Sequence, residues 1–262
     1  MSRAKNKDKR LNKVMNGTLY HNIKIIKTPT NKYYVCFTDD HKKEKLKSEI
    51  KEEEINVCAI DPGGRTPYTT YSENEVYEIG TNMNENLEKV FKIKKELNII
   101  YKKKIKEHKE KRVENKEYIL AKNNYRKINE KIRNMIDDLH FKAINKLMEY
   151  QIILIPRLNT KKIIEQENFN KKAKNVLQTL CHGQFIKRLT ERCELKGKHV
   201  IIVSEYLTSQ ICGSCFNKHK TESKTYKCPK CEITIDRYVN GARNIYTKYI
   251  GDVIYMMQEN LL

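Results

Sequence analysis

Apolar positions recur along the chain with two different periods, and each change of period marks a new element. Residues 55–60, 67–71 and 76–79 are short apolar runs separated by glycine-rich and Ser-Glu-Asn turns, which predicts three strands of a β-meander. In residues 86–112 and 123–150 apolar side chains return every three or four positions, as on one face of an amphipathic helix. The first half of the chain therefore predicts three strands followed by two long helices.

The second half of the chain alternates between strands and helices. Residues 151–155 and 199–204 are apolar runs that predict strands, and residues 169–196 between them are mostly helical in pattern. A cysteine-rich segment and a final helix follow. This order matches an α/β fold with an RNase H-like mixed sheet, in which the first three strands are antiparallel and the later ones parallel.

The N-terminal residues form a less regular region. Residues 1–13 are basic and polar, and they are expected to be an arm that either contacts phosphate or is simply solvated. Residues 20–26 and 32–37 are β-rich, and the turn-rich segment 27–31 between them predicts a hairpin. This hairpin is too small to be expected to fold alone.

Composition narrows the classes of partner. With 39% apolar residues the chain can bury a core, and its 53 Lys and Arg against 33 Asp and Glu give a net charge of +20. Such an excess favours a polyanionic partner, first of all nucleic acid. No apolar run approaches a membrane span and no signal-peptide pattern opens the chain. We therefore expect a soluble protein with no membrane partner, in a reducing intracellular compartment, the cytoplasm or nucleus.

The positive charge is dense in the two long helices. Between positions 89 and 133 there are 17 Lys and Arg against 6 Glu. A solvated outer face and a track for phosphate groups both explain this bias, and the sequence leaves both open.

Four of the eight cysteines form two close pairs. Cys212 and Cys215 make one Cys-x-x-Cys knuckle, and Cys228 and Cys231 make a second one after twelve residues. Two knuckles supply four thiolates for a closed tetrahedral shell, which predicts a structural Zn²⁺ site. The remaining cysteines lie singly and are expected to be small buried apolar residues: Cys36, Cys58, Cys181 and Cys193.

Three acids stand at the ends of predicted elements. Asp61 follows the first strand of the meander, Glu205 follows the last strand, and Asp236 begins the final helical segment. Nucleases that use two Mg²⁺ ions need several carboxylates that converge from separate segments. The three acids are therefore predicted as the catalytic, Mg²⁺-binding set, although an acid at a helix start is also a common N-cap.

These segments together resemble a known family. The matching stretches are AIDPGGRTP at 59–67, EYLTSQICGSC at 205–215 and DRYVNGARNI at 236–245. They are similar to the OrfB/TnpB transposon nucleases, and especially to their eukaryotic and viral Fanzor relatives, from about residue 20 to the last helix. The resemblance implies a RuvC-like, RNA-guided, Mg²⁺-dependent DNA endonuclease linked to transposition, with guide RNA and DNA as partners.

The resemblance also assigns the acids. In the bacterial family the second acid usually follows the fourth strand, where this chain has Pro156, which cannot bind metal. The Fanzor-like branch is similar to this chain in moving that acid to the end of the next strand, the position of Glu205. The resemblance thus implies Asp61, Glu205 and Asp236 as the catalytic set.

Family members usually have a longer region before the first acid, which forms wedge and recognition domains. Only about sixty residues precede Asp61 here, so the chain is expected to be N-terminally shortened. The expected division is a basic arm with a partial wedge (1–54), the first part of the RuvC-like domain (55–207), a zinc-ribbon insert (208–235) and a C-terminal RuvC-like helix (236–262). The alternatives are a catalytically inactive DNA- or RNA-binding zinc-ribbon protein and a zinc-ribbon transcription accessory.

Overall fold

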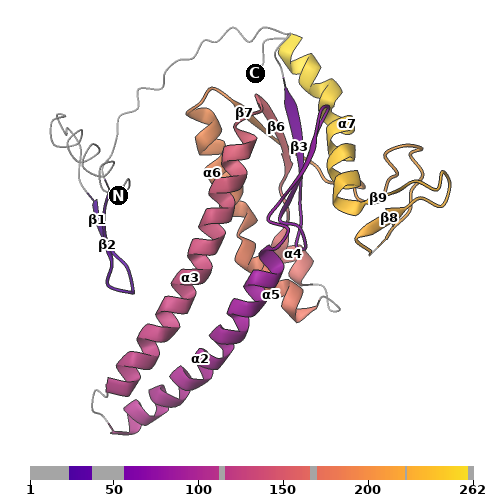
Figure 1. Cartoon of the computed structure of the whole chain (residues 1–262). Helices are drawn as coiled ribbons and strands as arrows, with labels where there is room; N and C mark the ends of the chain where they lie inside the picture. The colour runs from indigo at the N-terminus through magenta and orange to yellow at the C-terminus, as the bar shows by residue number, and fades with distance from the viewer. Residues whose placement is uncertain (1–23, 37–55, 112–115, 166–169, 222, 259–262) are drawn as a thin grey trace, which may run out of the picture. The chain divides into compact units, whose positions relative to one another are not determined.

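The structure is a computed structural model that describes residues 24–36, 56–111, 116–165, 170–221 and 223–258 (Figure 1). It divides into two units, Met1–Glu44 and Lys45–Leu262. In the first unit, β1 (Lys24–Lys27) and β2 (Tyr33–Cys36) pair antiparallel as the predicted hairpin. The predicted arm, residues 1–13, and residues 20–23 of the first predicted strand lie outside the described ranges. None of the described helices combines the length and apolar character needed to cross a bilayer.

The second unit is built on a five-stranded mixed sheet. Its strands are β3 (Val57–Pro62), β4 (Tyr68–Ser72), β5 (Val76–Ile79), β6 (Ile152–Pro156) and β7 (His199–Val203). They lie in the order β5-β4-β3-β6-β7. The meander strands pair antiparallel, and β6 and β7 join them in parallel. The predicted mixed sheet is confirmed.

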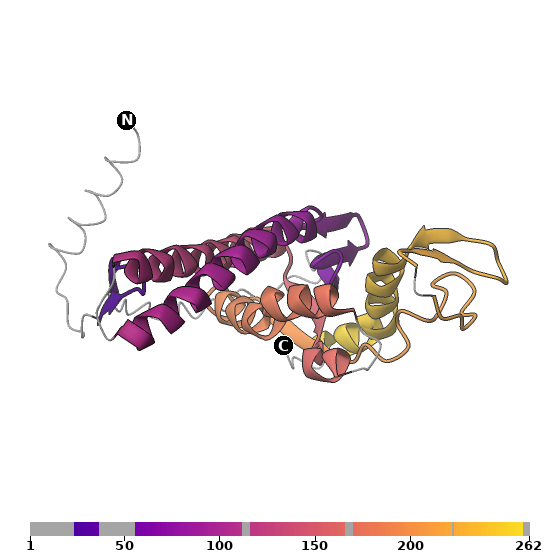
Figure 2. The ribbon, with the colours of Figure 1, turned by 90° about the horizontal axis from the view of Figure 1, so that it is seen from below.

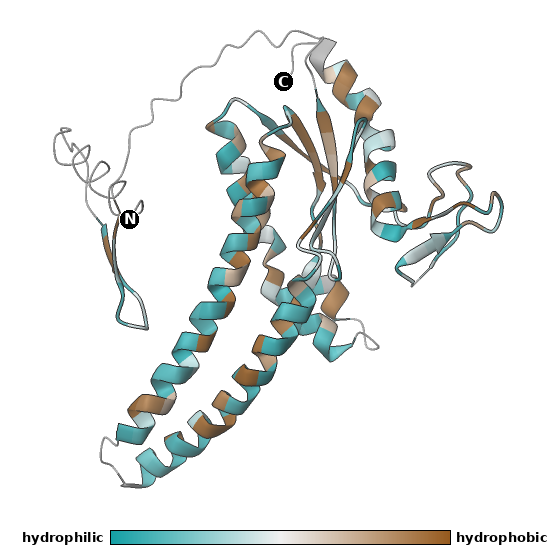
Figure 3. Cartoon of the chain, in the orientation of Figure 1, coloured by the Kyte–Doolittle hydropathy of each residue, from teal (hydrophilic) through white to brown (hydrophobic). Residues whose placement is uncertain are grey.

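Both faces of the sheet are covered, because successive side chains of a strand point to opposite sides. Cys58 and Ile60 of β3 pack into the larger core, together with α2, α3, α5 and α6. Val57 and Ala59 pack into a smaller core on the other face, together with α7. Figure 3 shows the resulting concentration of hydrophobic residues in the central strands, while the outer parts of α2 and α3 are mainly hydrophilic.

The two long helices, α2 (Met83–Lys111) and α3 (Lys116–Leu147), lie side by side as an antiparallel pair (Figures 1 and 2). Helix α3 begins seven residues earlier than the apolar period predicts. The reason is aromatic packing, since Tyr101 of α2 stacks on Tyr118 and Tyr125 of α3, with ring centroids 6.1 and 5.4 Å apart. Such stacked rings hold the outer part of the hairpin together where apolar residues are few.

The helical segment between β6 and β7 is broken into three pieces, α4 (Thr160–Ile164), α5 (Lys171–Leu180) and α6 (His182–Glu194). The break between α5 and α6 is Cys181, which has the left-handed backbone conformation with φ 50°. Cys181 and Cys36 are exposed, so the prediction of burial is wrong for these two, and it is confirmed for Cys58 and Cys193.

The cysteine-rich segment lies between β7 and the last helix. It contains two short strands, β8 (Thr225–Lys227) and β9 (Thr234–Asp236), which pair antiparallel. Helix α7 (Arg237–Gln258) follows β9 directly and runs along the sheet face opposite to α2 and α3 (Figure 1). This cysteine-rich segment, called the ribbon below, therefore connects β7, an edge strand of the sheet, to α7, which covers one face of the sheet.

Candidate functional site

Asp61 and Glu205 lie at the same edge of the sheet. In β3 Asp61 pairs with Thr69 of β4, one residue before the strand ends. Ala59 of β3 pairs in parallel with Leu154 of β6, and β6 pairs in parallel with β7. Continuing this register along the strands places Asp61 level with the carboxyl ends of β6 and β7. Glu205 comes two residues after β7 ends. The carboxyl ends of parallel strands meet at one edge of a sheet, so both acids lie there.

Asp236 reaches this region from the start of α7. Its Oδ1 accepts hydrogen bonds from the backbone N–H groups of Tyr238, at 2.8 Å, and Val239, at 3.4 Å. These contacts are those of a helix N-cap. Its Oδ2 lies 3.6 Å from Nζ of Lys224 in the ribbon. One oxygen of Asp236 thus holds the helix start, and the other faces a cation.

The electrostatics of Asp61 reflect the neighbouring acids. Burial, together with the charges of Glu205 and Asp236, raises the pKa of its carboxyl to about 8, although the Arg237 guanidinium acts to lower it. Like charges disfavour ionisation of a buried acid unless a cation is near. The structure therefore places Glu205 and Asp236 within electrostatic range of Asp61.

Glu205 occupies a more open position than Asp61. The residue as a whole is exposed to solvent. Desolvation of its carboxyl group still raises the pKa of Glu205. A carboxylate at such a partly desolvated position remains accessible to a ligand from solvent.

Two glycines let the helix and the strand end approach closely. A side chain at Gly241 of α7 would meet the Asp61 carboxylate directly, and one at Gly63 would lie 2.5 Å from the Tyr238 ring. Both positions therefore admit only hydrogen without displacing a neighbour. The contact of Gly241 with Asp61 was not predicted, since no local pattern relates residues 180 positions apart.

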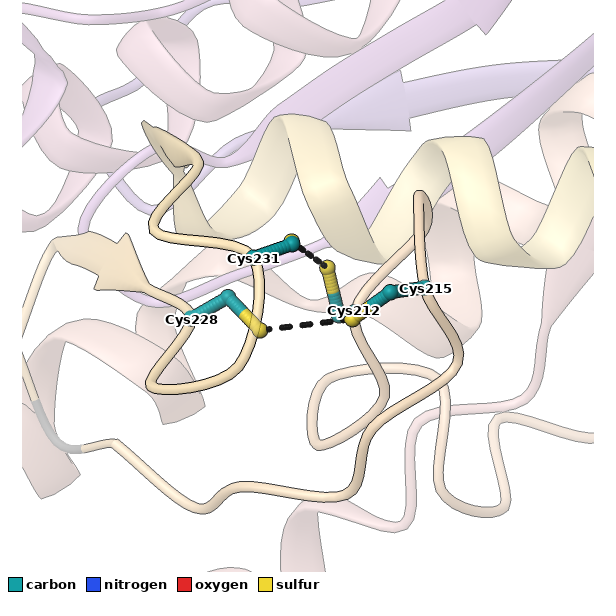
Figure 4. A group of neighbouring side chains, drawn as sticks. All are labelled: Cys212, Cys215, Cys228 and Cys231. Carbon is teal, nitrogen blue, oxygen red and sulfur yellow. Dashed lines mark hydrogen bonds between the residues drawn. The ribbon is translucent and has the colours of Figure 1, made fainter.

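The four cysteines of the two knuckles form a compact cluster (Figure 4). Their Sγ atoms all lie within 4.8 Å of one another. The Sγ atoms of Cys212 and Cys231 are 3.6 Å apart, and those of Cys215 and Cys228 are 3.5 Å apart. Four bonds of about 2.3 Å around a tetrahedral zinc ion separate the sulfurs by about 3.8 Å. The cluster therefore fits a metal ion of this size.

Backbone groups tune the thiols of the cluster. The N–H of Cys231 donates to Cys228 and lowers its pKa to about 6. The pKa of Cys231 itself is raised to about 12, because desolvation and hydrogen bonding with the other thiols outweigh the hydrogen bond from the Ile233 N–H.

Sequence reasoning missed some of the polar neighbours of the acids. Lys224 lies in the loop between the knuckles, where its ion pair with Asp236 has no signal in the sequence. Arg237 was considered as a support for the acids, and it lowers the pKa of Asp61. Its Nη1 also donates to the carbonyl of Thr221, at 3.2 Å.

The sequence of the chain is similar to those of known proteins. The family model described as the Cas12f1-like TNB domain matches residues 182–245. A TnpB-like protein of Acanthamoeba polyphaga mimivirus is 36% identical over 208 residues, which cover 73% of this chain and 37% of that protein. A second mimivirus protein, named as a candidate transposase, is 29% identical over 207 residues, with 78% and 42% covered. The chain spans about two fifths of the length of these curated relatives.

Among solved structures, the chain is similar to Cas12f1 in its cryo-EM complex with sgRNA and target DNA. The TM-score is 0.50 at 15% sequence identity, and the match covers 81% of this chain and 52% of that one. The fold is thus of the mixed α/β class, similar to that of Cas12f1, with a four-cysteine cluster compatible with a zinc ribbon. Within that class, the chain belongs to the TnpB-like family.

Proposed function

We propose that this chain carries the DNA-cleaving part of a transposon-encoded, RNA-guided nuclease, with Asp61, Glu205 and Asp236 as the ligands of two catalytic Mg²⁺ ions. The observation that carries the proposal is that Glu205 and Asp236 lie close enough to Asp61 for their charges to raise the pKa of its carboxyl. Membership of a family whose relatives are named as TnpB-like proteins and candidate transposases supports it.

Each acid has a distinct part in this proposal. Asp61 is the half-buried ligand, held on a central strand between β4 and β6. Glu205 is the more exposed ligand. Asp236 supplies one oxygen, since the other caps α7. Carboxylate oxygens suit Mg²⁺, and the bound ions would activate water and stabilise the leaving oxygen of a phosphodiester.

The ribbon has a structural part in the proposal. Four thiolates leave no open position on a bound Zn²⁺, so the ion would hold the two knuckles together and take no part in cleavage. Since thiolates must stay reduced to bind the metal, we also propose a reducing compartment, the cytoplasm or nucleus of a host cell.

DNA and a guide RNA are the proposed partners. The net charge of +20 and the exposed lysines of α2 provide an electrostatic surface for phosphate groups. In guided nucleases base pairing reads the sequence while the protein contacts the backbone, so such a surface needs no base-specific contacts of its own.

The test is cleavage of DNA by the full chain, purified with any RNA that accompanies it, in the presence and absence of Mg²⁺. Asp61→Ala should lower the rate by at least about 10³-fold, because it removes a metal ligand. Asp252→Ala is the matched control, since Asp252 is an exposed acid on α7. Sequencing the accompanying RNA would identify the guide and allow a matched DNA target to be made.

The proposal fails if no Mg²⁺-dependent cleavage of matched DNA is found, or if Asp61→Ala cleaves as fast as the unchanged chain. The alternative is a catalytically inactive DNA- or RNA-binding ribbon protein. The basic composition supports it, because charge alone gives binding without turnover. Salt-sensitive binding that Asp61→Ala leaves unchanged, with no cleavage, is the result that favours this alternative.

A further inference from the structure

The first two turns of α7 contact the ribbon through two asparagines. Asn240 is 1% exposed, and its amide makes two hydrogen bonds to the first knuckle. Its Nδ2 donates to the carbonyl of Ile211, at 2.8 Å, and its Oδ1 accepts from the N–H of Gly213, at 3.1 Å. Donor and acceptor of this side chain are therefore both used on the segment that carries Cys212.

Asn244 lies one helical turn further along α7 and extends the same contact. It is 9% exposed, and its Nδ2 donates to the carbonyls of Thr208 and Ile211, both at 2.7 Å. A side chain on Gly213 would lie 3.0 Å from its Oδ1. The knuckle thus contacts these two amides through its backbone groups.

An adjacent side of the same two turns contacts the strand that bears Asp61. Tyr238 packs against Gly63, and Gly241 packs against the Asp61 carboxylate. Asn240 and Asn244 are four residues apart and share the side of the helix that contacts the ribbon, while Gly241 lies beside that side and contacts Asp61. The start of α7 is held between the metal-binding knuckle and the acid site.

We propose that Asn240 and Asn244 are positioning residues that couple the metal-bound ribbon to the acid site. They would fix the first two turns of α7, and through them Asp236 and the Gly241 contact with Asp61, only while the knuckle is ordered by its metal. The catalytic meaning of this coupling rests on the proposed function, but the coupling itself is a property of the fold.

The coupling is expected because the side-chain amides of Asn240 and Asn244 are buried. If the knuckle loses its metal and its order, the Ile211 carbonyl and the Gly213 N–H no longer meet their partners. A buried amide without a hydrogen bond is unfavourable, so the start of α7 must shift or open to solvate it. The backbone of residues 237–245 should then exchange its amide hydrogens faster.

The experiment is amide hydrogen exchange followed by mass spectrometry on the full chain loaded with Zn²⁺, before and after removal of the ion by a chelator and without Mg²⁺. In the unchanged chain, removal should speed exchange in the ribbon and also, by about tenfold, in residues 237–245. The double variant Asn240→Ala/Asn244→Ala should show the faster exchange in 237–245 even with Zn²⁺ bound, and removal should add little there.

Thr247→Ala is the matched control, because Thr247 is exposed on the same helix, and it should behave as the unchanged chain. Where the double variant does not fold, as judged by circular dichroism, Asn244→Asp replaces it. This change keeps the size of the side chain but removes both of its donated hydrogen bonds. Zinc content, measured with a chromogenic chelator, confirms that each variant starts loaded.

Two results overturn the coupling. One is faster exchange confined to the ribbon when the metal is removed, with residues 237–245 unaffected. The other is exchange in the double variant equal to that of the unchanged chain. Neither result depends on cleavage, so a chain that cuts no DNA but shows the coupled exchange contradicts the proposed function and leaves the coupling standing.

Discussion

The acid site has no room for a side chain at position 241, because Gly241 lies directly against the Asp61 carboxylate. The position lies in the interior of α7, where alanine is ordinarily the better helix former by about 0.5–1 kcal/mol. Here the added methyl group would meet the Asp61 carboxylate. Gly251 on the same helix has nothing within 4 Å of the same methyl position. The two glycines therefore form a natural pair for separating helix propensity from the needs of the site.

Gly241→Ala is expected to displace the Asp61 carboxylate and to lower the cleavage rate by about tenfold or more, because a displacement of even 1 Å is costly in an active site. Gly251→Ala should leave cleavage unchanged and raise stability by about 0.4–1 kcal/mol. Cleavage rates and thermal melting of both variants check this. Equal cleavage by the two variants would contradict the role given to Gly241.

The pKa of Asp61 predicts how stability changes with pH. In the folded chain the pKa is about 8 against an ordinary value of 3.8. Between these values folded Asp61 keeps a proton that the unfolded chain releases, so the free energy of unfolding falls as pH rises from about 4 to 8. Asp61→Asn removes this dependence, because its amide stays neutral.

Without divalent cations, Asp61→Asn should therefore melt more than about 4 °C above the unchanged chain at pH 8 and close to it at pH 4, since 1 kcal/mol corresponds to about 2–4 °C and this pKa change to several kcal/mol. Mg²⁺ should raise the melting temperature of the unchanged chain at pH 8 and have a smaller effect on the variant. Calorimetry across this pH range measures both effects. Parallel pH curves for the two chains would mean that Asp61 is already ionised at neutral pH without a cation.

At the scale of the elements, helix α2 carries four exposed lysines at regular intervals. Lys92, Lys95, Lys102 and Lys106 are all exposed, and they recur with Ile99 at intervals of three or four residues. This spacing places them on one face of the helix. Two exposed lysines on other helices have ionic partners, since Lys142 of α3 pairs with Asp138 at 2.8 Å and Lys187 of α6 with Glu191 at 3.9 Å.

If the lysine face of α2 contacts phosphates, changing its four lysines to glutamine should weaken nucleic-acid binding by about tenfold or more at low salt. It should also reduce the slope of log K against log salt by up to about 3.6 for duplex DNA. Lys142→Gln/Lys187→Gln is the control and should change the slope little, since these charges already have partners. Fluorescence anisotropy over a salt series measures the slope. An unchanged slope would identify the face as merely solvated.

At the scale of the whole molecule, the strands of the sheet could be predicted because their apolar residues form recognisable runs in the sequence. The apolar runs of β3, β6 and β7 and the period of α2 were visible in the sequence, and so was the pairing of the knuckles. The early start of α3 was not, because the stacking of Tyr101 on Tyr118 and Tyr125 crosses from one helix to another. Long-range side-chain contacts leave no periodic signal.

The same limit applies to the site. The three acids were predicted from their places at element ends, and their catalytic role stays a prediction. The residues that surround them were harder to predict. No sequence pattern related Asn240 or Asn244 to the ribbon, and only the folded chain shows their partners there. Lys224 likewise gains its meaning from a neighbour twelve positions away that β8 and β9 bring back to it.

The wide spacing of the acids along the chain has a consequence for synthesis. Asp61 precedes Asp236 by 175 positions, and the ribbon lies between Glu205 and Asp236. A ribosome therefore completes almost all of the sheet before the last carboxylate and its helix emerge. Until then a nascent chain holds at most two of the three acids, so under the proposed function it has no complete set of Mg²⁺ ligands during translation. Under the same proposal, prematurely terminated products that lack α7 should not cleave the DNA of the cell that makes them.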